Sequence, residues 1–149
     1  MRAVVQRVVE ASVRVDGETI ARIGAGLLVL LSVGVDDDDA DSRAMAEKVA
    51  GLRIFSDRDG LMNETLASVR GAVLLVSQFT LHGDVRRGRR PSFIAAAKEP
   101  QAIALFEGTG RRLEELGIPV QYGRFGAKMD VALVNTGPVT ILVDTKRLF

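Results

Sequence analysis

This sequence of 149 residues lacks cysteine and tryptophan and contains a single histidine. Without cysteine the chain cannot form a disulfide, a thiolate zinc site, an iron–sulfur cluster or a cysteine nucleophile. A single histidine excludes the zinc-binding helix motif that needs two imidazoles. Charge of one sign is not in excess either, because 20 basic and 19 acidic residues give a formal net charge of +1. Binding to nucleic acid would therefore depend on a local basic patch.

Long apolar segments are also absent. The longest apolar run, Leu27 to Val35, is far shorter than the roughly 20 residues that cross a bilayer. The N-terminal stretch contains Arg2, Gln6 and Arg7 and does not resemble a signal peptide. We therefore expect a cytoplasmic protein with no membrane partner, and the length and even composition predict one domain over residues 1–149.

Hydrophobic patterning predicts several strands in the first half of the chain. Val4 to Val15, Gly26 to Val33 and Ala72 to Leu81 are rich in apolar and β-branched residues. Gly26 to Val33 is apolar enough to be buried on both faces. Asp16-Gly17 lies between two alternating runs and predicts a hairpin, because both turn positions require positive φ.

Two helices and two further strands complete the expected elements. The acidic run Asp36 to Asp41 should open one helix, with Met45, Val49 and Leu52 buried; it lacks the ligand pattern of a calcium loop. A second helix is expected over Pro100 to Leu116, with Ile103, Phe106, Leu113 and Leu116 as its buried stripe. Met129 to Val134 and Val139 to Val143 read as strands. The sum predicts an α+β fold in which mixed or antiparallel sheets form a barrel-like core with two main helices.

Polar side chains gather at the end of the strand expected over residues 72–81. Ser77, Gln78 and Thr80 follow an apolar stretch, where unsatisfied polar groups cost stability and often mark a site. They are equally consistent with capping of the strand and bonding to a following turn. On an extended strand Thr80 and His82 share a face while Ser77 points away, so a Ser–His pair is disfavoured. We expect His82 to lie at the surface.

Two further segments stand out. Arg86 to Phe93 contains four arginines within five residues, a glycine and a phenylalanine, which would suit phosphate contacts and stacking on an anionic polymer. A solvated loop is the simpler interpretation, but the local charge favours the polymer. Gly137-Pro138 lies between two expected strands and fits either an ordinary hairpin turn or a special tight geometry. The sequence does not define its isomer, since only about 5–6% of X–Pro bonds are cis.

Taken together, these segments resemble the D-aminoacyl-tRNA deacylase family over essentially the whole chain. The main signatures are Ser77 to Leu81 and Asn135 to Thr140, in this order and in a chain of this length. Supporting segments are Val5 to Val8, Gly24 to Val29, Arg53 to Asp57, Arg90 to Phe93 and Gly123 to Phe125.

The resemblance implies a homodimeric editing hydrolase with no cofactor and no metal. Such enzymes cleave the ester between a D-amino acid and the 3′-terminal adenosine of tRNA, and also remove glycine mischarged onto alanine tRNA. Gly137 and Pro138 would match the family's Gly-cisPro motif, which reaches from one subunit into the pocket of the other and excludes L-amino acids with its carbonyls. Arg7 would help to lock that motif.

The resemblance also implies a catalytic segment made of Ser77, Gln78, Phe79 and Thr80. Main-chain N–H groups near Phe79 would stabilise the oxyanion. Thr80 lacks an identifiable base, so we favour attack by water with help from the terminal ribose hydroxyl. Phe125 and Met129 would line the adenosine pocket. The candidate contacts to tRNA phosphates are Arg86, Arg87, Arg89, Arg90 and Lys128.

Two other functions remain open from the residues alone. A non-catalytic RNA-binding or dimerisation domain would use the arginine segment but would not need a polar cluster facing a pocket. A general esterase would use Ser77 or Thr80 as nucleophile and would need His82 as its base. His82→Ala should then cost several orders of magnitude in activity, whereas an editing hydrolase should keep nearly all of it.

Overall fold

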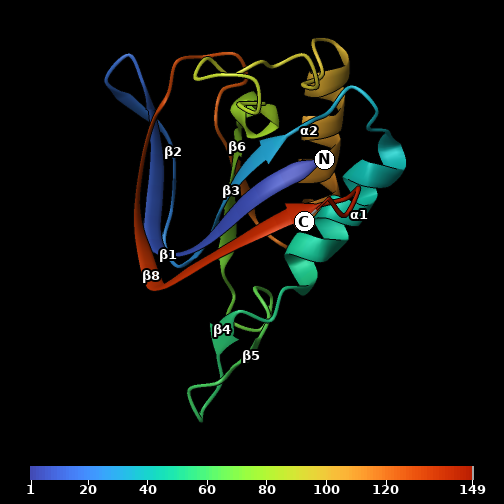
Figure 1. Cartoon of the computed structure of the whole chain (residues 1–149). Helices are drawn as coiled ribbons and strands as arrows, with labels where there is room; N and C mark the ends of the chain where they lie inside the picture. Colours follow the sequence, from blue (N-terminus) through green and yellow to red (C-terminus); the bar gives the residue numbers. More distant parts are fainter. Residues whose placement is uncertain (149) are drawn as a thin grey trace.

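A long first strand, β1, organises the sheet in the computed structural model, which describes residues 1–148. One edge of β1 pairs antiparallel with β2 and β3, and the other edge pairs antiparallel with β8 (Figure 1). β3, β6 and β7 continue the sheet with parallel pairing. The strands of this sheet are β1 (Arg2–Val15), β2 (Glu18–Ile23), β3 (Gly26–Ser32), β6 (Ala72–Ser77), β7 (Val120–Tyr122) and β8 (Asp130–Asp144).

Two helices lie on one side of this sheet. α1 (Asp39–Gly51) and α2 (Gln101–Glu115) pack against each other, and α2 also contacts β3 and β7 (Figure 1). β4 (Phe55–Ser56) and β5 (Met62–Glu64) form a small separate hairpin. Neither helix of the described chain is long and apolar enough to span a membrane. The predicted α+β fold, with a mixed barrel-like sheet and two main helices, is confirmed.

Alternation along β3 and β6 divides the core into two parts. Leu27 and Leu75 face the helices and belong to a cluster that includes Met45 of α1. Leu28 and Leu74 point to the opposite side and pack inside the curved sheet. The prediction that the first of these strands is buried on both faces is therefore confirmed, and it explains why β3 is a continuous apolar run.

Asp41 links the first turn of α1 to the segment that follows β8. Its carboxylate accepts hydrogen bonds from the Asp38 N–H at 3.1 Å and from Lys146 Nζ at 2.6 Å. Burial alone would raise the pKa of Asp41, but these hydrogen bonds and one from Thr145 lower it to about 2. Residues 144–148 thus brace the start of α1, while Phe149 lies outside the described residues.

The ion pair between Asp41 and Lys146 should make the free energy of unfolding decrease at acid pH. Because the pKa of Asp41 lies below its ordinary 3.8, its contribution is present above that value and lost as the pH falls toward 2. Asp41→Asn should lower the free energy of unfolding by about 2 kcal/mol at pH 7, and the gap to the wild type should close near pH 2. Denaturation curves at both pH values measure this, with the exposed Asp36→Asn as the charge-matched control. An equal gap at both pH values would refute the role of the pair.

One expected strand end and one expected core residue were wrong. The strand expected over residues 72–81 ends at Ser77, and Phe79–His82 form a short 3-10 helix, η1. The Gln78 N–H still donates to the Leu31 carbonyl at 2.8 Å, as the last rung of the β3–β6 ladder, and the Leu81 N–H then donates back to the Gln78 carbonyl at 3.2 Å, which begins the turn. Leu116, expected in the buried stripe of the second helix, is 51% exposed at the end of α2.

The two strands expected near the C-terminus are one strand, β8, because both halves pair with the same edge of β1. Asn135 pairs with Val8 and Thr140 pairs with Gln6, so β8 advances five residues while β1 advances two. The additional residues include Gly137-Pro138 and form an outward bulge, which we call the β8 bulge (residues 136–139). The pair is therefore not a hairpin turn, and its peptide bond is cis.

Candidate active site

A pocket of about 300 Å³ opens at the carboxyl ends of β3 and β6. The two strands run parallel and Leu31 pairs with Ser77, so the residues that follow them emerge side by side at one edge. The remaining walls come from α2 and from the loop before β8. Residues predicted separately meet here: the lining includes Ser77, Gln78, Phe79, Phe125 and Met129.

The wall formed by the loop before β8 is apolar and tightly packed. Phe125 meets Phe106 of α2 edge to face, with ring centroids 5.8 Å apart. Gly123 lets Met129 approach closely, because an added Cβ at this glycine would lie 2.9 Å from Met129 Sδ. This wall can hold a flat apolar group such as a base, and the hydrogen-bonding side chains Ser77 and Gln78 line the pocket elsewhere.

The η1 turn adds further polar groups. Gln78 Nε2 donates a hydrogen bond to Thr80 Oγ1, which fixes both side chains at the rim. The N–H groups of Phe79 and Thr80 begin the turn, where the i→i+3 pattern of a 3-10 helix offers them no acceptor. Because Phe79 lines the pocket, its N–H is a candidate donor to a negatively charged oxygen bound there, whereas Thr80, predicted as part of the same segment, is not among the lining residues.

His82 is buried, contrary to the surface position expected from the sequence. It is 9% exposed, and its Nδ1 lies 2.6 Å from Ser32 Oγ. The Ser32 hydroxyl also lies 3.3 Å from the Phe79 carbonyl, so Ser32 bridges the imidazole and the start of the η1 turn. Burial and the positive charge of Arg2 lower the pKa of His82, so the ring is neutral at pH 7. His82 thus supports the η1 turn through Ser32.

This arrangement argues against the general esterase. A nucleophilic hydroxyl needs a base within hydrogen-bond reach, but the imidazole Nδ1 is engaged by Ser32 rather than by Ser77 or Thr80. Removing His82 would disturb the turn whatever the chemistry, so His82→Ala cannot separate the two functions as the sequence suggested. Within residues 1–148, no cluster of three or more acidic or histidine side chains is placed to hold a metal ion.

Gly137 and Pro138 do not line this pocket within one chain. Both are exposed in the β8 bulge and are absent from the pocket lining. In Figure 1, β8 bends at the lower left, whereas the η1 turn (yellow-green) lies near the top. Arg7 is close to the bulge, as the family pattern implies. Its Nε donates to the Thr136 carbonyl at 3.1 Å and its Nη1 donates to the Ile54 carbonyl, so Arg7 ties the bulge to the segment before β4.

The arginine-rich segment forms a hairpin, which we call the basic hairpin (residues 84–92). Asp84 and Ser92 exchange backbone hydrogen bonds of 2.8 and 2.9 Å at its base. Arg86 pairs with Asp84 through two nitrogens at 2.9 and 2.7 Å, and these hydrogen bonds lower the pKa of Asp84 to about 2. Other basic side chains of this surface have no ion pair in the described part of the chain; they are Arg87, Arg89, Arg90 and Lys128.

Sequence reasoning missed one pocket residue that supports the η1 turn, Ser32. It ends a buried parallel strand beside the one that ends in Ser77, and polar residues at two such ends are the signal that would have found it. Two alanines that also line the pocket, Ala97 and Ala102, have no feature in the sequence that would mark them as pocket residues.

Comparison with known proteins agrees with this geometry. The model of the D-Tyr-tRNA(Tyr) deacylase family matches residues 4–144. A protein of Roseiflexus castenholzii named D-aminoacyl-tRNA deacylase is 57% identical over 97% of this chain and 92% of its own length. A protein of the same name from Symbiobacterium thermophilum is 54% identical over 100% of this chain and 99% of its own.

Solved structures share the fold. A c-Myc DNA unwinding element binding protein superposes with a TM-score of 0.92 and 38% identity, over 97% of this chain and 99% of its own. A probable eukaryotic D-amino acid tRNA deacylase superposes with a TM-score of 0.79 over 95% of this chain and 97% of its own; at 18% identity this shows the fold alone. With a family model that spans nearly all of its length and relatives above half identity, the chain belongs to the D-Tyr-tRNA(Tyr) deacylase family.

Proposed function

We propose that this protein hydrolyses the ester between a D-amino acid and the 3′-terminal adenosine of tRNA, which releases the amino acid and the intact tRNA. The observation that supports the proposal is the pocket, whose lining combines the start of the η1 turn at Phe79 with the apolar side chains of Phe125 and Met129. The shared name of the curated relatives supports the same reaction.

The proposed chemistry relies on the main chain. With adenine against Phe125 and Met129, the ester carbonyl would lie near the main-chain N–H groups that begin the η1 turn, where Phe79 lines the same pocket. Water attacks the carbonyl carbon, and the negative charge that develops on the carbonyl oxygen is stabilised by these donors. The bond to the ribose O3′ then breaks, and the proton lost by the water passes to O3′ with help from the neighbouring ribose hydroxyl. No acidic or basic side chain is needed for this transfer.

Thr80 provides a test of that choice of attacking group. Thr80→Val keeps the shape of the side chain and removes its hydroxyl. With water as the attacking group, the single-turnover rate on D-tyrosyl-tRNA should fall less than about 10-fold, a loss due to the broken bond to Gln78. A nucleophilic Thr80 would instead lose a factor of about 10⁴ or more. Thr80→Ser, which retains a hydroxyl, serves as the control.

Selection for D-amino acids is proposed to require a second copy of the chain. In a homodimer the β8 bulge of one subunit would enter the pocket of the other, since Gly137 and Pro138 are exposed and do not line the pocket of their own chain. Their carbonyls would accept hydrogen bonds from the substrate ammonium group and occupy the space that an L side chain needs. Glycine has no side chain to exclude, so glycine mischarged onto alanine tRNA should also be hydrolysed.

The basic hairpin is proposed to contact the tRNA backbone. Arg87, Arg89, Arg90 and Lys128 are exposed and have no ion pair in residues 1–148, so they can pair with phosphates. Arg86 keeps its exposed guanidinium beside Asp84 and fixes the base of the hairpin instead of adding a full positive charge.

Incubation of the purified protein with D-tyrosyl-tRNA tests the proposed reaction. We expect release of free D-tyrosine and of tRNA that can be charged again. A protein that binds the tRNA and releases no D-tyrosine would instead support the non-catalytic RNA-binding domain, and hydrolysis of simple aryl esters with equal efficiency would support the general esterase.

A further inference from the structure

An aromatic pair stands at the mouth of the candidate pocket. The rings of Phe79 and Phe93 meet edge to face, with centroids 5.0 Å apart and planes at 72°. Phe79 lines the pocket, yet it remains 57% exposed. Phe93 packs over Gly83, where an added Cβ would lie 3.0 Å from its ring. The two rings therefore form a fixed and partly exposed aromatic surface directly outside the pocket.

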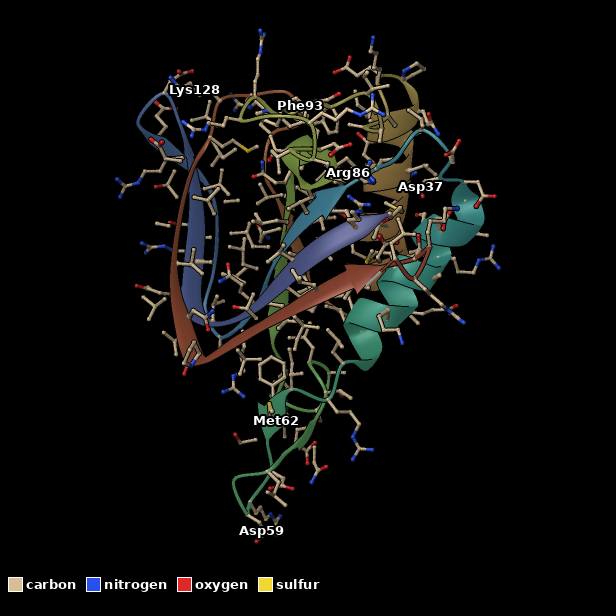
Figure 2. All side chains as sticks on the ribbon, viewed as in Figure 1. Asp37, Asp59, Met62, Arg86, Phe93 and Lys128 are labelled. Atoms are coloured by element: carbon tan, nitrogen blue, oxygen red, sulfur yellow. The ribbon has the colours of Figure 1, made fainter. Side chains whose placement is uncertain are left out.

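The same pair adjoins the basic hairpin. Phe93 directly follows Ser92, whose backbone pairs with Asp84 to close the hairpin, so the arginines project from a segment that Phe93 anchors. Figure 2 shows Phe93 and Lys128 at the same end of the molecule, opposite Asp59. Exposed aromatic rings beside unpaired cations are typical of surfaces that bind single-stranded nucleic acid, where bases stack and phosphates meet arginine.

We propose that the Phe79–Phe93 pair stacks with the base that precedes the terminal adenosine of the tRNA. This inference rests on the proposed function, because it places that adenosine in the pocket beside Phe125. A strand that leaves the pocket past Phe79 meets the ring of Phe93 next and the basic hairpin after it. Stacking accepts any base, so this contact adds affinity for the single-stranded 3′ end without selecting among tRNAs.

Equilibrium binding of the trinucleotide CCA and of adenosine tests the proposal. The wild type should bind CCA more tightly than adenosine by about 5- to 150-fold, the range expected for one stacked base. Phe93→Ala should remove that advantage and leave the dissociation constant for adenosine unchanged. Phe93→Tyr keeps the ring and should keep the advantage, whereas Phe93→Leu fills a similar volume without a ring and should lose it.

Several outcomes would overturn the stacking contact. A parallel loss of CCA and adenosine binding would mean that Phe93 only supports the pocket through Phe79. A wild type without preference for CCA, or full CCA binding by the folded Phe93→Leu variant, would also refute it, and the leucine variant decides if the alanine variant fails to fold. These ligands carry no amino acid, so failure of the proposed hydrolysis is seen separately, as D-tyrosyl-tRNA left intact by the wild type.

Discussion

Replacement of Gly137 by alanine should remove most of the activity and leave the fold intact. Gly137 has a φ of 128°, which L side chains rarely adopt, and an added Cβ would lie 2.8 Å from Arg7 Nη2 and from Val139 Cγ2. The β8 bulge would have to move, and its carbonyls would leave the positions that the proposed partner pocket requires. Because a misplacement of about 1 Å can cost 100-fold, kcat/KM for D-tyrosyl-tRNA should fall by about that factor.

Gly24→Ala is the matched control for this variant. Gly24 lies in the turn between β2 and β3, outside the positive-φ region and with open space where a Cβ would be added. It should retain the wild-type rate and thermal stability. Circular dichroism should show that both variants fold. A Gly137→Ala enzyme with full activity would contradict the role given to the bulge.

Separation of the proposed dimer into monomers should lower kcat/KM at least as much as Gly137→Ala does. β1 and β8 leave apolar side chains exposed at Val9, Val134 and Leu142, although soluble chains tend to limit exposed apolar patches that no partner covers. Leu142→Asp would place a charge on the strand that carries the bulge and should yield monomers. Since no partner bulge would then reach the pocket, kcat/KM should fall by about 100-fold or more.

Leu116→Asp makes the same change on the other side of the molecule. Leu116 is exposed at the end of α2, whereas Leu142 alternates with Ile141 and Val143, which pack against the helix-side core, and therefore points away from the helices. This variant should remain dimeric and active. Sedimentation equilibrium and the hydrolysis rate, measured on the same samples, provide the comparison. A monomeric Leu142→Asp enzyme with wild-type activity would refute the shared active site.

Local signals in the sequence predicted local structure well. Asp16 and Gly17 have φ values of 51° and 83° and join β1 to β2 as the hairpin signal requires. The acidic run before α1 does cap it, through a reciprocal pair of hydrogen bonds between Asp38 and Asp41. In both cases the interacting groups lie within a few residues of one another. The local sequence therefore includes every group that stabilises the turn or the cap.

Features that depend on distant partners were predicted less well. Phe79 to His82 has the composition of a strand, but the bonds of Ser32 to the Phe79 carbonyl and to the His82 ring hold it in a turn. β8 looked like two strands because Gly137-Pro138 is a typical break, and only its register against β1 shows a single strand with a bulge. These outcomes depend on residues at least 47 positions apart and have no local signature.

In the candidate site too, the sequence predicted which residues take part better than it predicted how they act together. The sequence identified Ser77, Gln78 and Phe79 together with Phe125 and Met129, and the fold brings all five to one pocket. The roles given to them remain predictions, as do those of Gly137, Pro138 and Arg7, because the proposed site needs a second subunit and a single chain does not contain it.

The account is tested most directly by the ratio of kcat/KM for D-tyrosyl-tRNA and L-tyrosyl-tRNA, measured with the same purified protein. Exclusion of L side chains by main-chain carbonyls predicts a preference for the D-enantiomer of at least about 1,000-fold, or about 4 kcal/mol. Glycine on alanine tRNA should be hydrolysed as well. Equal rates for the two enantiomers, or no turnover of either, would contradict the account.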